Sequence, residues 1–529
     1  MIGVNYVLKQ EWSNSLDFWI GTLGFAIGFG GFWRLPYAIF AHGGGAFFIP
    51  YFICYMIFAY PLFYWESALG QIYRSNAIIS FASLDKRLKG IGYAQCVMTI
   101  IVASTYVYLI TYSMIFMMDC FSFPLPWRDD NMTALNTTEG LHQTHFYKDV
   151  LQISSDLREP GGINPSVFWV NALTLFLCFV TISFGLNFSG KISYATSIAP
   201  FILLGIFFVR GCFLDGWWEG LGFLVSIDYL ALFDPILWFE AAAQAIFQVS
   251  IGLSAVIQLS SYRKRHEDIG RSSFWICMLN LFTGVFSSII VFGFMGYVAK
   301  TADTKLEDIP LRGFDLVFIA YPQALLRMPQ AGLWTFLLYL MLFLIGFQSE
   351  FILLESITAY FIEANIKFKN IYLKPLHIRI LVVLACFILG LILSTRGGFY
   401  YFEIFDRYGV VTNIITVATI ELVVMGWHPA VVQLQNLVLG FTGEGATQYL
   451  KKVTKYYGAI GGLILSLGAG MSFLVSVFRL PVWLFFVSVG FTVGPLALVG
   501  YFYYERPKKA RSSEQPLLLE MKGEHSYSF

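Results

Sequence analysis

The sequence predicts an all-α membrane protein with about 12 transmembrane helices, two of them interrupted near the middle of the bilayer. Of the 529 residues, 57% are hydrophobic and 13% are charged, whereas a soluble protein carries about 25% charged residues. The mean hydropathy is +0.66. Apolar runs of the roughly 20 residues that a spanning helix needs recur along most of the chain. These observations indicate a polytopic membrane protein.

The apolar runs set the expected spans and the expected sidedness. Spans are predicted at residues 18–40, 46–73, 92–121, 166–184, 192–213, 236–261, 271–298, 332–362, 378–395, 403–427, 456–477 and 482–504. Basic residues cluster in alternate loops, as at 263–265 and 451–455. The positive-inside rule therefore places these loops and both termini in the cytoplasm.

The first span contains the most informative stretch of the chain. Five glycines lie from Gly21 to Gly31, and Pro36 closes the run. Glycine and proline are poor helix formers, so this span is expected to be broken. Unpaired backbone is tolerated inside a bilayer only where it lines a cavity or meets a ligand. Arg34 lies near the outer end of this span, where a charge must be paired or in contact with water.

The sixth span is a second candidate for a broken helix. Residues 250–254, Ser-Ile-Gly-Leu-Ser, lie at its centre. Two interrupted spans in corresponding positions of two halves are typical of an inverted-repeat transporter, with the substrate at their junction.

Two polar segments are expected on the outer side. Loop 122–165 carries the glycosylation sequons at Asn131 and Asn136. Loop 299–331 contains an apolar stretch, 314–326, that could form a short re-entrant or surface helix.

Several function classes are disfavoured by the composition. The net charge is +1 and no basic face with stacking aromatics is present, so nucleic acid is not an expected partner, whereas membrane lipid is. A membrane-embedded enzyme would call for buried His with Asp/Glu clusters, and the spans show none in sequence.

Several motifs, in this order along nearly the whole chain, resemble the neurotransmitter:sodium symporter family, which has the LeuT-type fold. They are Trp33-Arg34-Leu35-Pro36-Tyr37, Gly43-Gly44-Gly45-Ala46-Phe47, Ile49-Pro50-Tyr51, Ser189-Gly190-Lys191, Pro200-Phe201, Gln244, Gly397-Gly398 and Phe405-Asp406-Arg407-Tyr408.

The resemblance implies a secondary transporter, not an enzyme, with a 5+5 inverted repeat and broken helices 1 and 6. Its expected domains are a cytoplasmic N-terminus at 1–17, a transporter domain at 18–504 and a disordered cytoplasmic tail at 505–529. Family members import amino acids, amines or osmolytes with sodium and often chloride. The expected function is sodium-coupled symport of neutral amino acids. Altered coupling, to protons or to none, and a transport-inactive sensor or accessory role stay open.

The resemblance also implies a substrate site. Gly28 stands where amine transporters carry an aspartate, and Tyr106 matches the tyrosine that holds the substrate carboxylate. The carbonyl of Ala26 lies beside them. The side-chain pocket would be apolar with one hydroxyl and no charge, which favours a neutral amino acid. It would comprise Val102, Phe247, Ser250, Leu253 and Leu353.

The implied sodium sites depart from the family pattern. The first would use the Ala26 carbonyl with the side chains at positions 31, 248 and 280. The family has asparagine at position 31, serine or threonine at 248 and asparagine at 280, whereas this chain has Gly31, Gln248 and Asn280. The second would use the carbonyls of Gly24, Ile27 and Ile345 with the side chains of Gln348 and Ser349, and the family places Asp or Thr at position 348. Sodium is expected, with the second site as the main one.

Chloride dependence is doubtful by the same comparison. Tyr51, Gln244 and Asn280 are kept, but the two serines of the family are replaced by Gln248 and Gly284.

The gates and the tail complete the implied features. Arg34 and Asp406 match the outer gate, whereas Lys9 and Trp12 with Glu363 could form the inner gate. Residues 514–519 resemble an acidic dileucine signal for a sorting adaptor. Such a signal leaves both the plasma membrane and an endolysosomal membrane open.

Overall fold

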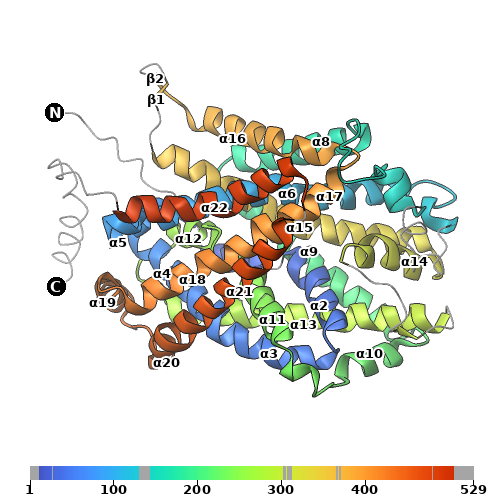
Figure 1. Ribbon diagram of the computed structural model, residues 1–529, viewed down its shortest axis with the longest axis horizontal. Coiled ribbons are helices and arrows are strands. Elements are labelled where there is room, and N and C mark those ends of the chain that lie inside the picture. Colours follow the sequence, from blue (N-terminus) through green and yellow to red (C-terminus); the bar gives the residue numbers. More distant parts are fainter. Residues whose placement is uncertain are drawn as a thin grey trace.

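The computed structural model describes residues 11–12, 14–26, 28–129, 143–301, 305–306, 313–364, 367–368, 371–478 and 480–504. In this part of the chain the regular secondary structure is helical apart from one small hairpin, in which β1 (Lys367–Phe368) pairs antiparallel with β2 (Ile371–Tyr372). Figure 1 shows long helices running roughly along the longest axis of the molecule. The predicted all-α class is confirmed.

Ten apolar helices in the described residues are long enough to cross a bilayer, and they match the predicted spans 2–5 and 7–12. Their main segments are α3 (Phe48–Cys54) with α4 (Tyr60–Tyr73), α6 (Lys89–Asp119), α8 (Pro165–Ser183), α9 (Leu186–Gly211), α13 (Ile269–Thr301), α15 (Ala331–Glu363), α16 (Pro375–Gly390), α17 (Gly398–Ile404) with α18 (Thr412–Trp427), α20 (Gln448–Lys452) with α21 (Ala459–Val477), and α22 (Val482–Tyr504). The tenth and eleventh begin several residues before their predicted starts at 403 and 456, so the basic stretch 451–455, predicted as loop, is helical.

The first span is broken as predicted. Helix α1 (Ser15–Ala26) ends before Gly28, and the chain resumes as a π-helical turn, Gly30–Arg34, that leads into α2 (Leu35–Ala41). The two halves are bent by 46°. The glycines favour this break because glycine is a poor helix former.

The sixth span is broken as well. Helix α11 (Pro235–Gln248) and α12 (Ala255–Ser261) are separated by six residues. Ser250, Gly252 and Ser254 there have φ of 54°, 77° and 60°. This left-handed conformation cannot continue a right-handed helix. Helix α12 lies against α4, and a Cβ at Gly70 would collide with the carbonyl of Ile257.

Shorter helices cap the two ends of the bundle. Figure 1 places α5 (Ala77–Leu84), α19 (Ala430–Thr442) and the hairpin at one end, and α10 (Trp217–Val225) and α14 (Tyr321–Leu326) at the other. Helix α14, with the π-helical turn Leu316–Ala320 before it, forms the short helix expected within 314–326. Asn131 and Asn136 lie outside the described residues.

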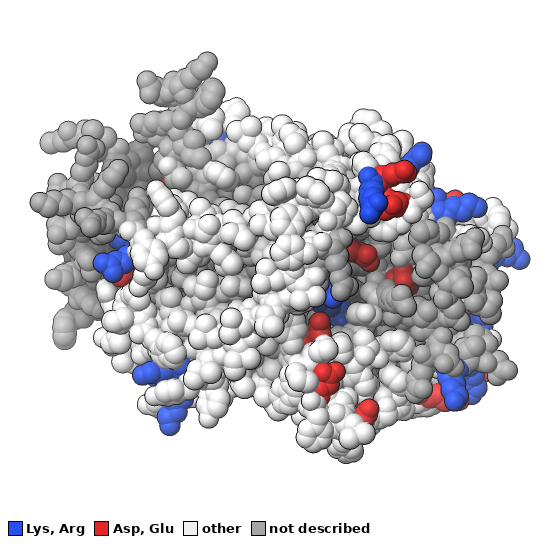
Figure 2. All heavy atoms as spheres, in the orientation of Figure 1, with Lys and Arg blue, Asp and Glu red and all other residues white. Residues whose placement is uncertain are grey.

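The core is central and the perimeter is apolar. Helices α6 and α15 pack against each other and are buried along most of their length. By contrast, α21 exposes Ile464 and Leu467, and α22 exposes Phe486. On the face in Figure 2, charged side chains gather toward the two ends and leave a broad uncharged band between them. Such a band suits contact with lipid tails.

Candidate functional site

The break in the first span meets two hydroxyl groups. The backbone N–H of Phe29 donates to the Tyr106 hydroxyl at 3.3 Å, and the two rings pack edge to face. A Cβ built on Gly28 would lie 3.6 Å from both Tyr106 Oη and Ser349 Oγ. Glycine thus leaves a small space between α6 and α15 that faces hydroxyls, a setting able to receive an anionic group.

Phe247 covers the outer side of this space. A Cβ on Gly30 would touch its ring at 3.0 Å, and the guanidinium of Arg34 lies 4.7 Å from the ring centre. Among the other predicted pocket residues, Val102, Leu253 and Leu353 are buried, and Ser250 is half-buried. The Leu253 carbonyl accepts from Thr99 at 2.6 Å, one turn before Val102 on α6.

The two residues of the predicted outer gate lie near each other. Arg34 Nη1 lies 3.9 Å from Asp406 Oδ2, and the two side chains are 14% and 25% exposed. Asp406 lies in the π-helical turn Phe405–Val411 of the tenth span. Arg34 therefore lies against both the Asp406 carboxylate and the Phe247 ring, and it links the two residues.

Trp12, predicted for the inner gate, is buried against the end of the sixth span. Its backbone N–H donates to the Tyr262 carbonyl at 3.0 Å, and its indole N–H donates to the Leu259 carbonyl at 3.1 Å. Lys9 lies outside the described residues. Glu363 accepts from the backbone and side-chain N–H groups of Asn76 at 2.9 and 2.8 Å.

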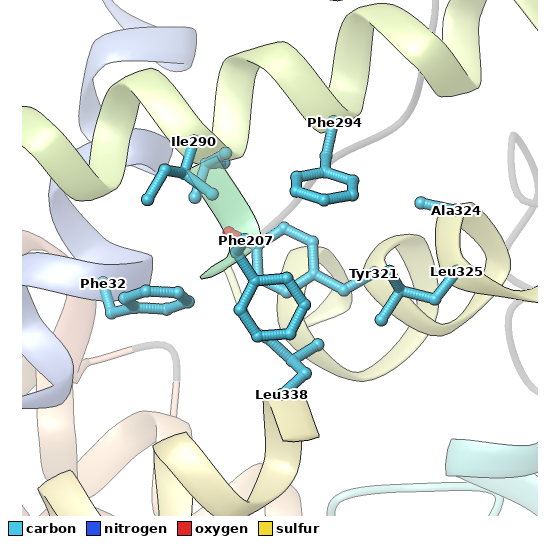
Figure 3. A pocket seen from close by; sticks show the side chains of 9 residues that line it. Phe32, Phe207, Ile290, Phe294, Tyr321, Ala324, Leu325 and Leu338 are labelled. Atoms are coloured by element: carbon cyan, nitrogen blue, oxygen red, sulfur yellow. The ribbon is translucent and has the colours of Figure 1, made fainter. Parts of the chain in front are cut away.

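A separate pocket lies toward α14 and is not the predicted site. Its walls are apolar side chains from five segments of the chain, and none is a predicted substrate residue. Figure 3 shows Phe32, Phe207, Phe294 and Tyr321 converging on it. Apart from the hydroxyl of Tyr321, the side chains that line it are apolar and uncharged.

At the second predicted sodium position, the carboxamide of Gln348 is hydrogen-bonded to residues of α9 and α1. Its oxygen accepts from the hydroxyls of Thr196 and Ser197 at 2.6 and 2.8 Å. Its nitrogen donates to the Gly21 carbonyl at 3.4 Å, and a Cβ on Gly24 would collide with it. Ile27 is outside the described residues. Sodium binds oxygen, not N–H donors, so this arrangement does not fit the ion.

At the first sodium position an amide also faces the ligand carbonyls. Asn280 Nδ2 donates to the Ala26 carbonyl at 2.6 Å and to the Gln248 carbonyl at 3.3 Å. Gly31 contributes no side-chain oxygen, and a Cβ there would lie 3.6 Å from Gln248 Nε2. This position does not fit sodium in the arrangement described.

The three residues kept for chloride surround Gln248. Tyr51 and Gln244 donate to Gln248 Oε1 at 2.6 and 3.1 Å. Gln248 Nε2 in turn donates to the Asn280 carbonyl at 3.3 Å. The donors expected to hold an anion therefore already hold an amide oxygen.

Comparison with known proteins settles the family. Residues 9–503 match the sodium:neurotransmitter symporter family. The chain belongs to this family. A creatine transporter of Torpedo marmorata is 31% identical, over 79% of this chain and 72% of its own length. GABA transporter 2 of Bos taurus, named sodium- and chloride-dependent, is 29% identical over 76% of this chain and 69% of its own. Its Rattus norvegicus counterpart is 28% identical, over 79% and 73%.

This member of the symporter family is therefore a multi-pass membrane transporter.

Sequence reasoning missed a pair of buried acids in its core. Gln95 donates to both Glu66, at 3.2 Å, and Glu421. Glu66 also accepts from the backbone N–H of Gly252 at 2.8 Å, inside the break of the sixth span. The sequence did not reveal this pair of acids, because the two residues meet only in the fold. A lone acid within an apolar run was the available signal.

Proposed function

We propose that this transporter carries neutral amino acids by alternating access. The observation that supports this most is the space at Gly28, which faces Tyr106 Oη and Ser349 Oγ beside the N–H of Phe29. A substrate carboxylate placed there would take hydroxyl and backbone donors. Charge-assisted bonds of this kind are roughly twice as strong as neutral ones.

The surroundings favour a substrate with a neutral side chain. Val102, Leu253 and Leu353 are buried apolar residues. A charged side chain among them would lack a partner, at a cost of several kcal/mol. Creatine and GABA, named for the relatives, also carry a carboxylate. The carboxylate end is therefore the shared chemistry, and the remainder of the molecule must be tested.

For the coupling ion we favour altered coupling over the expected use of sodium. Sodium and chloride appear in the names of relatives. In this chain, amide N–H groups of Gln348 and Asn280 face the carbonyls expected to bind sodium. The amide oxygen of Gln248 takes the donors expected for chloride. These contacts support transport in which neither ion is required.

The test is uptake into proteoliposomes of a labelled panel containing aliphatic and aromatic amino acids, GABA and creatine. Sodium is replaced by potassium, then chloride by gluconate, and a pH gradient is imposed last. We expect uptake of neutral amino acids that survives both replacements. Uptake that collapses without sodium would restore the expected coupling. Folded protein with no uptake in any condition would point to the sensor or accessory role.

We also propose the orientation, the glycosylation sites and the sorting signal that the sequence predicts. Both termini face the cytoplasm, Asn131 and Asn136 carry glycans, and residues 514–519 bind a sorting adaptor. Deglycosylation of the protein tests the two glycans. The double change Leu518→Ala with Leu519→Ala tests the sorting signal, and its readout is localisation to the plasma membrane or to an endolysosomal membrane.

A further inference from the structure

One buried arginine lies just after the second half of the sixth span. Arg263 follows α12 and is only 2% exposed, although arginine is rarely buried unless it is paired. Its Nε donates to Glu267 Oε2 at 3.1 Å, its Nη1 donates to Ser272 Oγ at 2.9 Å, and its Nη2 donates to the Asp268 carbonyl at 3.3 Å. These three bonds fix the plane of the guanidinium to the loop between α12 and α13 and to the start of α13.

The face of this guanidinium covers a residue of the first span. Arg263 Cζ lies 4.3 Å from the ring centre of Phe18, which belongs to the first turn of α1 and is itself buried. A cation over an aromatic ring is held more strongly when water is excluded from both groups. The edge of the Arg263 guanidinium therefore bonds its own loop and α13, whereas its face holds α1.

The same segment also holds the chain before α1. Trp12 donates its backbone N–H to the Tyr262 carbonyl and its indole N–H to the Leu259 carbonyl. Residues 259–263 thus hold the beginning of the first span at two places, Trp12 and Phe18.

A small cavity lies beside these contacts. Trp12, Gly21, Ser193 and Tyr262 are among its lining residues, and its volume is about 20 Å³, which is room for about one water molecule. A solute can pass here only if the walls of the cavity separate. Two of these walls, Trp12 and Tyr262, are joined by the contacts described above.

We propose that Arg263 is a positioning residue that holds α1 against the end of the sixth span through the Phe18 ring, and so keeps this side of the transporter closed. This inference rests on the proposed function, in which each side of the transporter opens in turn. Separation of Phe18 from Arg263 leaves the three hydrogen bonds of the guanidinium in place and returns its face to water. The contact can therefore break and form again in each cycle without leaving the charge unpaired.

The experiment measures how fast a water-soluble maleimide labels a cysteine in the cavity, introduced as Ser193→Cys into the full chain in detergent micelles. Labelling of the chain without this change is subtracted, because the chain has seven native cysteines. Phe18→Leu removes the ring and keeps an apolar side chain, whereas Arg263→Lys keeps the charge but cannot stack as a planar group. Each change is expected to speed labelling roughly five- to tenfold, the factor that corresponds to the loss of one buried cation–π contact.

The double variant shows whether the two residues act through one contact. Phe18→Leu combined with Arg263→Lys should label no faster than either single variant, since both changes remove the same interaction. Arg271→Lys, which alters an exposed arginine of α13, is the matched control and should label at the parent rate. The thermal midpoint of each variant shows whether it is folded.

Labelling of the single variants at the parent rate overturns the role of Arg263, and so does a double variant in which the two effects multiply. If Arg263→Lys does not fold, Phe18→Leu decides alone, because it leaves the hydrogen bonds of the guanidinium untouched. Exchange of labelled neutral amino acids in proteoliposomes tests the proposed function separately. Absence of exchange in folded wild-type protein refutes that function, whereas the labelling rates decide the contact between Arg263 and Phe18.

Discussion

The hydroxyl of Tyr51 donates to the side-chain oxygen of Gln248 at 2.6 Å, across two helices that are 197 residues apart in sequence. Gln244 donates to the same oxygen. An oxygen that accepts from two buried donors satisfies the groups that would otherwise need an anion.

The first prediction concerns chloride. Replacing chloride by gluconate should leave uptake by the wild-type protein unchanged, because Gln248 already supplies the acceptor. The double change Gln248→Ser with Gly284→Ser removes that acceptor and adds hydroxyl donors, so uptake should become chloride-dependent. Initial rates in the two salts measure both effects. A wild-type rate that falls in gluconate would contradict the assignment.

The second prediction concerns Tyr106. Changing it to Phe removes a donor to the substrate carboxylate, and a hydrogen bond to a charged group is worth about 1.5–3 kcal/mol. Substrate binding should weaken by about 10- to 100-fold, with the thermal midpoint little changed. Scintillation binding measures the affinity. Tyr108→Phe is the control on the same helix, because Tyr108 bonds Gly390 and Ser394 on the far side.

The third prediction concerns the outer gate. The Arg34–Asp406 pair is partly exposed and 3.9 Å apart, so its loss in Asp406→Asn should change stability by less than about 1 kcal/mol. If the pair acts as the predicted outer gate, the transport rate should nevertheless fall, because the variant lacks the attraction that would hold the closed state. The transport rate of Arg34→Lys should fall similarly, since an ammonium cannot stack flat on the Phe247 ring as a guanidinium does. Equal rates for Arg34→Lys and wild type would refute the contribution of stacking.

The fourth prediction concerns pH and the outer segment. Burial of His145 lowers its pKa, but its bonds to Asp119 and Asp149, at 3.1 and 3.0 Å, outweigh this and leave the pKa raised above 6.5. The folded state therefore binds this proton more tightly than the unfolded state. The resulting stability is fully present below pH 6.5 and is lost as pH rises through the raised value.

Hydrogen exchange of residues 143–151 measures this effect. Protection that depends on His145 should fall as pH rises from below 6.5, once intrinsic exchange rates are taken into account. His145→Gln should remove that dependence. A wild-type profile as flat as that of the variant would exclude the histidine.

Much of the fold was accessible from sequence because a bilayer imposes a length and a composition on each helix. The apolar runs located the spans, and the glycines before Pro36 located the first break. The start of the eleventh span was predicted too late, because Lys451 and Lys452 were interpreted as loop residues. They lie near the beginning of the span, where long side chains can reach water.

The site was only partly accessible. The resemblance identified Gly28 and Tyr106, which lie side by side, and Arg34 and Asp406, which lie 3.9 Å apart. It could not show that Gln348 and Gln248 turn their amides into the ion positions, since that depends on three-dimensional reach. The acids of the core were missed because periodicity does not reveal which distant residue a side chain will face.

The close approach of α12 to α4 at Gly70 has a mechanical meaning. With backbone almost touching backbone, these two segments cannot slide past each other without a collision. Any displacement of α12 would therefore have to carry α4 with it. The left-handed residues between α11 and α12 interrupt the sixth span, so α11 would not have to follow such a displacement.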